Sequence, residues 1–195
     1  MALRVNISAD IKKATAFFNE LDKRSISYGS SNALNVVIRT VRNETINEVA
    51  DVRRVKRSLI RKAIEISKRA IYYELTTVLR AVGRVISLRE YSARQSDRGV
   101  TVNVQGTPKL LTRAFGPGYG RGRFSQAKRL GGHVFERLTA ARLPIKQLWG
   151  PSITTGFIKD QVRRVQRAAI ARDWQRTMNQ KLEEQLVKLR AKYGG

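Results

Sequence analysis

Clustered cations are the residues of this chain best suited to chemistry. Lys and Arg number 39 against 15 Asp and Glu, which gives a formal net charge of +24. On a helix, cations three or four residues apart can contact several phosphates of a nucleic-acid backbone, with affinity but no sequence readout. The densest positive run holds a single acid, Glu65, among Arg53, Arg54, Lys56, Arg57, Arg61, Lys62, Lys68 and Arg69.

We predict that this run is helical and that it contacts DNA or an acidic protein, with Arg54, Arg57, Arg61 and Lys68 near one another. The alternative is a solvated face that only keeps the protein soluble. Because few acids are available to pair these cations, the sequence favours contact with a polyanion.

A second group of cations lies in the glycine-rich segment 116–132. It contains Arg121, Arg123, Lys128 and Arg129, with Tyr119 and Phe124 able to stack on bases. The segment lacks the Gly-Lys-Ser/Thr ending of a nucleotide-binding P-loop. We interpret it as a loop that orders on assembly, and DNA contact is the alternative.

The sequence indicates no catalytic residue, metal ligand or cofactor site. The chain has no cysteine and one histidine, His133, which excludes disulfides, thiol chemistry and a Cys-based zinc site. No serine has the nucleophile-elbow pattern. The carboxylates of the last third lie at helical spacing from Arg and Lys and are expected to form surface ion pairs. We therefore predict that the protein is not an enzyme.

Hydrophobic periodicity predicts helices at both ends of the chain and strands between them. Helices are expected over 8–24 and from Ser31 to Ile66, with an interruption at 28–31 and a break after Val52. Crowded β-branched and aromatic residues predict a strand over 70–79. Further short strands are expected over 85–88, 100–104, 110–115, 133–137 and 143–149. From Thr154 to Tyr193 the pattern predicts a helix about 60 Å long at 1.5 Å per residue.

These elements predict an α+β fold in which a mainly antiparallel sheet of about five or six short strands packs with the helices. The expected division is a helical arm (1–30), an α+β core (31–156) and the long C-terminal helix (157–195). Because that helix outruns a small domain, part of its apolar stripe should form a subunit interface. The stripe comprises Trp174, Met178, Leu182, Leu186 and Leu189. Without a secretory or membrane-spanning pattern, we expect a soluble protein.

The segment 143–152 reads as an edge strand opened by Pro144, broken by Gly150-Pro151 and followed by a helix that Ser152 caps. It resembles the corresponding segment of the phage minor tail protein Z family. The residues that carry this likeness are Leu143, Pro144, Ile145, Leu148, Trp149, Gly150, Pro151 and Ser152. The resemblance extends from about Ser31 to the C-terminus through segments 85–88, 93–95, 99–104, 113–115 and 133–137, which occur in the family's order.

The resemblance implies a virion structural protein at the head-proximal end of a phage tail, assembled in the host cytoplasm and needed for tail completion and head–tail joining. It also implies a homo-oligomeric ring, six-fold by family analogy, that contacts the tail tube and the tail terminator or head–tail connector proteins. Phage DNA in the channel is a further expected contact, and no membrane is involved. Charge alone suggests an alternative, a cellular ribosome-associated or nucleoid protein that binds nucleic acid.

Overall fold

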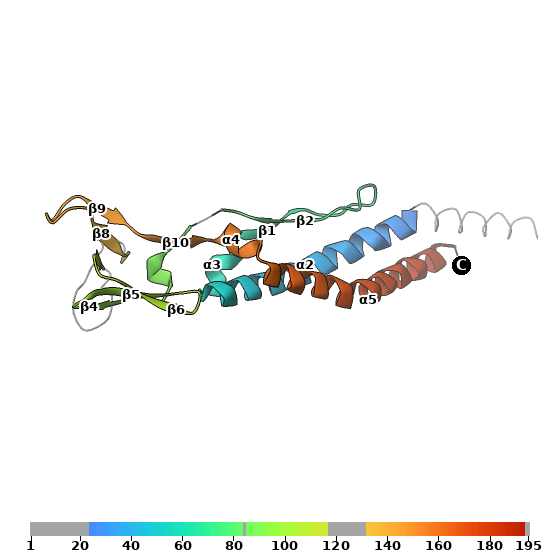
Figure 1. The fold of residues 1–195 in the computed structure, drawn as a ribbon. Helices are drawn as coiled ribbons and strands as arrows, with labels where there is room; N and C mark the ends of the chain where they lie inside the picture. Colours follow the sequence, from blue (N-terminus) through green and yellow to red (C-terminus); the bar gives the residue numbers. More distant parts are fainter. Residues whose placement is uncertain (1–23, 84, 117–131, 194–195) are drawn as a thin grey trace, which may run out of the picture. The chain divides into compact units, whose positions relative to one another are not determined.

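The computed structural model describes residues 24–83, 85–116 and 132–193 and has an α+β fold, as predicted (Figure 1). Its helical elements are α2 (Ile26–Arg53), α3 (Arg57–Arg61), η2 (Leu88–Glu90), α4 (Ile153–Phe157) and α5 (Asp160–Tyr193). Its strands are β1 (Ile64–Lys68), β2 (Val78–Ala81), β3 (Val85–Ser87), β4 (Arg94–Ser96), β5 (Gly99–Val104), β6 (Thr107–Leu111), β7 (Ala114–Phe115), β8 (Phe135–Arg137), β9 (Ile145–Gln147) and β10 (Trp149–Ser152).

The strands form separate small sheets rather than one continuous sheet. Their orders are β1-β2, β10-β3, β4-β5-β6 and β7-β8-β9. The strongest ladder is β5–β6, antiparallel, which sets Val100 opposite Leu111 and Val104 opposite Thr107. Val100 and Val102 are buried, as the alternating valines predict. The strands have only two to six residues, and β10 pairs with β3, which lies more than sixty residues earlier in the chain.

The chain divides into two compact units. The described part of unit 1 comprises residues 24–42, 66–80 and 166–193, and that of unit 2 comprises residues 43–65, 81–83, 85–116 and 132–165. Each unit thus combines segments that are distant in sequence. The division into arm, core and terminal helix stays a prediction.

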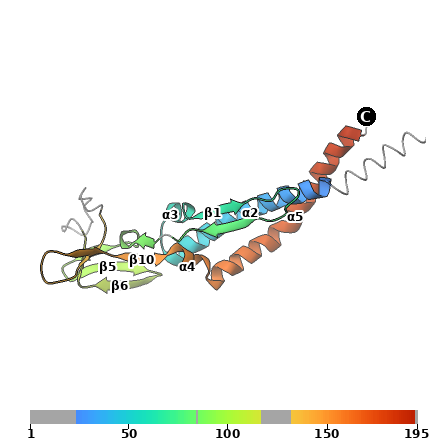
Figure 2. The same cartoon turned by 90° about the horizontal axis from the view of Figure 1, so that it is seen from above.

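Unit 1 is built on α2 and α5, which run antiparallel side by side in the two views (Figures 1 and 2). Val37 and Val41 on α2 pack with Ala169 on α5, and Leu79 and Trp174 cover this cluster. The apolar face that the helical spacing predicts is therefore the core of the unit.

Several predicted boundaries are wrong. The helix α2 begins at Ile26 and passes through residues 28–31, where Gly29 lies against Leu182. It ends at Arg53 because Arg54 adopts a left-handed φ of 56°, and residues 64–68 form β1 instead of more helix. Residues 70–77 form the turn of the β1–β2 hairpin. The helix predicted for 8–24 lies almost wholly outside the described residues.

The C-terminal helix is also interrupted where continuity was predicted. Ser152 caps α4 as expected, with its Oγ accepting a hydrogen bond from the Thr155 amide at 3.4 Å. However, α4 ends after one turn and a separate helix, α5, starts at Asp160. The long helical pattern therefore corresponds to two helices of very unequal length.

One amide side chain fixes the hairpin of unit 1 to α2. Asn35 Nδ2 donates to the carbonyl oxygen of Ala70 at 2.8 Å, and the Ala70 amide donates to Asn35 Oδ1 at 3.0 Å. Ala70 is 3% exposed, so water cannot readily replace these bonds. Asn35 thus holds the point at which the chain leaves β1.

Replacing Asn35 should destabilise the fold much more than replacing its exposed neighbour Asn32. Asn35→Ala leaves both backbone groups of Ala70 without their partner, which we expect to lower the free energy of unfolding by about 2 kcal/mol. The control Asn32→Ala, on the same helix, should change it by less than about 0.5 kcal/mol. Urea unfolding followed by circular dichroism measures both, and equal effects would contradict the assigned role of Asn35.

Candidate charged surfaces

Arg53, the first residue of the predicted cationic run, faces the interior of unit 2. It is 2% exposed, and its Nη2 donates to the Ser152 carbonyl oxygen at 3.2 Å and to Thr155 Oγ1. A Cβ at position 156 would lie 2.9 Å from Arg53 Nε, so Gly156 provides the space for the guanidinium. The burial of Arg53 argues against its predicted contact with DNA or an acidic protein.

The cations that follow Arg53 occupy the connection from α2 to β1. Arg54, Lys56, Arg57, Arg61 and Lys62 are all exposed there. The short helix α3 is anchored by apolar residues, since Ile60, Ala63 and Ile64 are fully buried. The connection thus turns its apolar side inward and its cations to solvent. We call these five cations the α2–β1 cationic surface.

The predicted grouping of these cations on one helix is wrong. Arg54 lies in a turn, Arg57 and Arg61 lie on α3, and Lys68 lies in β1. Lys68 and Arg69 belong to unit 1, and Lys68 forms an exposed ion pair with Glu74. The cations Arg121, Arg123, Lys128 and Arg129 lie outside the described residues.

A cation that the sequence analysis missed lies near this surface. Lys159 Nζ donates to Gln105 Oε1 at 3.4 Å in the turn between β5 and β6. The same turn lies close to Arg54, because a Cβ at position 106 would be 3.9 Å from Arg54 Nε. Arg54 and Lys159 are more than a hundred residues apart, so no local pattern could have joined them.

The predicted subunit-interface stripe on α5 lies largely against its own unit. Trp174 packs on the Val37–Val41–Ala169 cluster, Leu182 contacts Gly29, and Leu189 is buried. Met178 and Leu186 are half-buried. Packing within unit 1 explains this burial, and a role of the stripe between subunits stays a prediction.

The family-motif segment packs around Tyr91, a residue that the sequence analysis did not single out. Tyr91 is fully buried, and its hydroxyl donates to the Pro151 carbonyl oxygen at 3.3 Å. Burial raises the pKa of this phenol above its ordinary value, while the Arg53 cation acts in the opposite direction. Gly150 and Pro151 lie within β10, which pairs with β3, so the predicted strand break is wrong. Glycine is needed at 150 because the Tyr91 ring lies directly against its backbone.

The apolar residues at the start of the motif are more exposed to solvent than the residues of a hydrophobic core. Leu143 and Trp149 are 67% and 51% exposed, whereas Ile145 and Leu148 are half-buried. Pro144 follows a cis peptide bond and precedes β9. The exposed Leu143 and Trp149 provide apolar surface in unit 2.

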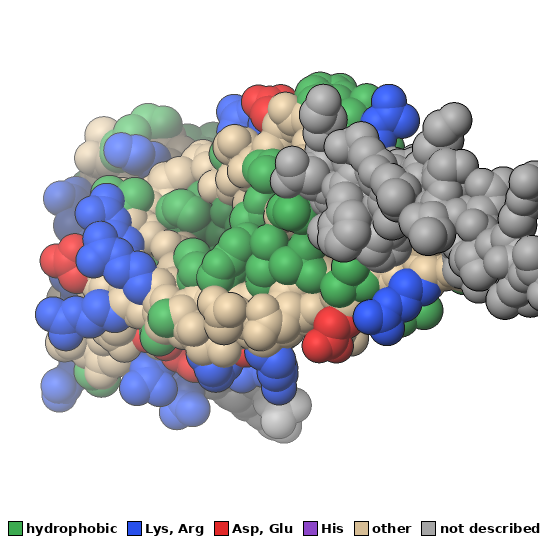
Figure 3. Space-filling view, turned by 90° about the vertical axis from the view of Figure 1, so that its right-hand side faces the viewer, with side chains coloured by type: hydrophobic (Ala, Val, Ile, Leu, Met, Phe, Trp, Pro, Cys, Tyr) green, Lys and Arg blue, Asp and Glu red, His purple; other side chains and the backbone are tan. Residues whose placement is uncertain are grey.

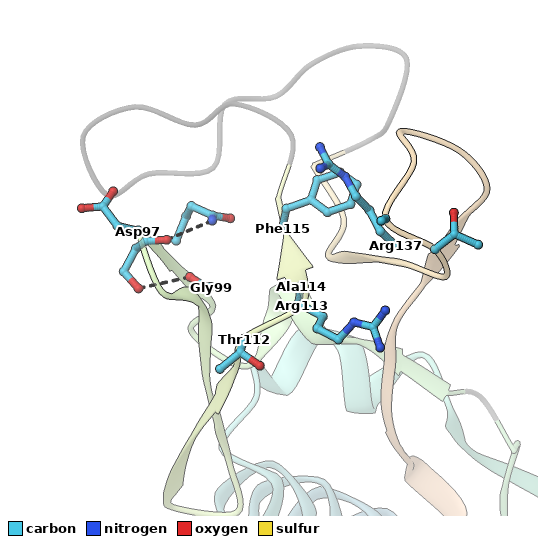
Figure 4. Close-up of a pocket in the computed structure, with 11 residues that line it drawn as sticks. Asp97, Gly99, Thr112, Arg113, Ala114, Phe115 and Arg137 are labelled. Carbon is cyan, nitrogen blue, oxygen red and sulfur yellow. Dashed lines mark hydrogen bonds between the residues drawn. The ribbon is translucent and has the colours of Figure 1, made fainter.

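In the part of unit 2 that the structure describes, the hollow drawn in Figure 4 does not bring catalytic groups together. The hollow drawn in Figure 4 has a volume of about 380 Å³ and is lined by residues of the β4–β5 and β6–β7 connections and by Arg137. The guanidinium carbon of Arg137 lies over the Phe115 ring, 5.3 Å from the ring centroid. The side chains of Asp97 and Arg113 point away from each other (Figure 4). His133 Nδ1 is hydrogen bonded to Ser87 Oγ at 2.8 Å. Within the described residues, no group of three or more His, Asp or Glu side chains could hold a metal ion.

The comparisons with known proteins identify the family. The family model described as "Prophage minor tail protein Z (GPZ)" matches residues 10–188. Neither a curated protein nor a solved structure matches the chain. Because the match covers most of its 195 residues, the chain belongs to the prophage minor tail protein Z family.

Membership of this family makes the chain a phage minor tail protein and a component of the virion. This agrees with the likeness carried by residues 143–152 and favours the tail interpretation over a ribosome-associated or nucleoid protein. No helix in residues 24–83, 85–116 and 132–193 is both long and apolar enough to span a membrane.

Substituting Gly150 tests the packing of the motif on Tyr91. A Cβ at position 150 would lie 2.3 Å from Tyr91 Cε2, so Gly150→Ala must displace a buried ring. We expect it to lower the free energy of unfolding by about 2–3 kcal/mol. In the control Gly83→Ala, the new Cβ would meet Thr154 at an ordinary 3.7 Å, and stability should change by less than about 1 kcal/mol. Thermal unfolding measures both, and a Gly150→Ala variant as stable as the control would refute the contact.

Proposed function

We propose that this protein completes the tail at its head-proximal end and takes part in joining the tail to the head, as a structural component without catalysis. The observation that carries the proposal is the family match over residues 10–188. Exposed apolar and cationic surfaces support it, since an assembly protein acts through the surfaces that its neighbours contact.

The apolar surface of unit 1 suits contact with other proteins of the tail. At the tip of the β1–β2 hairpin, Tyr73 is 73% exposed and Leu75 is 46% exposed. Tyr72 stacks on Tyr28 of α2, with ring centroids 4.9 Å apart, and meets Tyr73 edge-on. Figure 3 shows apolar side chains at the surface, bordered by Lys and Arg. Aromatic residues of this kind are enriched in protein interfaces.

These contacts would join copies of the chain into a ring and link it to the tail tube and to the tail terminator or head–tail connector proteins. A tyrosine-rich tip supports such contacts because large rigid rings bury much surface with little loss of side-chain entropy. The six-fold order of the ring is proposed by family analogy.

The α2–β1 cationic surface would face a polyanion in the assembled tail, either DNA in the channel or an acidic protein lumen. Its five exposed cations lie on one short connection, and Asp51 and Glu65 stand at its ends. Contacts with phosphate there would give affinity that depends steeply on salt and little on base sequence.

Immunogold labelling of phage particles and free tails tests the proposed location. Antibody against the purified protein should label only the head-proximal tail end in electron micrographs. Particles from a phage with a nonsense mutation in the gene serve as the control and should carry no label. Label at the distal tip or along the whole tail would overturn the head-proximal proposal while leaving family membership intact.

A further inference from the structure

Unit 1 contains a hollow of about 280 Å³ between α2, the residue after β1 and α5, which we call the α2–α5 pocket. Arg39 reaches it from α2, Arg69 from the end of β1 and Lys181 from α5. All three belong to the same unit. Cations from segments distant in sequence thus converge on one concave site.

The local structure holds the two arginines in place. Asn35 accepts from and donates to the backbone of Ala70, which fixes the chain directly after Arg69. Arg39 follows Asn35 by four residues and therefore lies one helical turn along the same face of α2. The bonds that fix the hairpin to α2 thus hold the backbone of Arg69 near Arg39, and both residues line the pocket.

The charges of the pocket do not cancel. Lys181 Nζ donates to both oxygens of Glu184, at 2.6 and 2.8 Å, so the only carboxylate in the lining already has a cation. This hydrogen bond lowers the pKa of Glu184, and the carboxylate is ionised at neutral pH. Within the described residues, the side chains of Arg39 and Arg69 make no hydrogen bond or ion pair. Two positive charges remain for a ligand.

We propose that the α2–α5 pocket binds a phosphate group through Arg39 and Arg69, with the side-chain amide of Asn32 as an additional donor. Guanidinium groups present planar N–H pairs that match phosphate oxygens, and such charge-assisted bonds are stronger than neutral ones. A phosphodiester of a nucleic-acid backbone and free phosphate share this chemistry. The site does not depend on the proposed head-proximal location.

The test compares two double variants of the full chain with equal net charge. Arg39→Gln/Arg69→Gln removes both guanidinium groups of the pocket. Arg80→Gln/Arg167→Gln removes two exposed arginines of unit 1 outside the lining and is the control. Binding of inorganic phosphate is followed by phosphorus NMR line broadening at constant ionic strength. Binding of a short DNA duplex is followed by fluorescence anisotropy over a range of salt concentrations, and circular dichroism checks that each variant is folded.

We expect the pocket variant to bind phosphate at least about tenfold more weakly than the wild type, and the control to bind as the wild type does. If the natural ligand is the DNA backbone, the salt slope of duplex binding should also fall by about 1 in the pocket variant. An unchanged slope with lost phosphate binding would assign the pocket to free phosphate. Equal losses in both variants would overturn the proposal, because net charge alone would then explain binding. Absence of phosphate binding by the wild type would overturn it as well.

As a second variant, Asn32→Asp places a carboxylate in the pocket lining without removing a cation. Its charge would occupy the guanidinium groups, so phosphate binding should weaken by about tenfold or more. Asn43→Asp, an exposed change on the same helix outside the lining, is its control. A folded Asn32→Asp variant with full phosphate affinity would contradict the proposed site.

Discussion

The arrangement of unit 2 depends on the burial of one cation, Arg53. A guanidinium loses strong hydration when it leaves water, so it is tolerated inside a protein only where hydrogen bonds replace that water. The carbonyl of Ser152 and the hydroxyl of Thr155 accept hydrogen bonds from Arg53 Nη2, while Arg53 Nε is buried without a partner among the described residues. These hydrogen bonds connect the end of α2 to the junction of β10 and α4, about a hundred residues later. Gly156 leaves the space that the side chain needs.

This constraint explains where the neighbouring charges lie. Once Arg53 points inward, the helix ends and Arg54 turns the chain with a left-handed φ. The connection that follows is anchored by buried Ile60 and Ile64 and exposes its cations. Tyr91 extends the same buried group by its bond to Pro151 and its contact with Gly150. Gly150, Pro151 and Ser152 of the family motif thus act as partners of Tyr91 and of Arg53 at the end of α2.

Sequence patterns predicted what depends on neighbours in the chain. The α+β class, the α2 and α5 faces, the β5 alternation and the Ser152 cap all have local signals, and all are present. Local signals did not distinguish Arg53 from Arg54, because two adjacent arginines differ only in their long-range partners. The aromatic run 70–79 was predicted to be a strand because β propensity cannot separate a buried strand from an exposed hairpin tip. The pocket of Arg39, Arg69 and Lys181 exists only after three distant segments have packed.

The most direct measurement of the central claim is amide hydrogen exchange, followed by mass spectrometry, in the wild type, Arg53→Ala and Arg54→Ala. If Arg53 joins the two segments, its replacement should speed exchange in residues 45–53 and in residues 149–157 together. The neighbouring variant Arg54→Ala should leave both segments as protected as in the wild type. Faster exchange confined to residues near position 53, with 149–157 unchanged, would contradict the account.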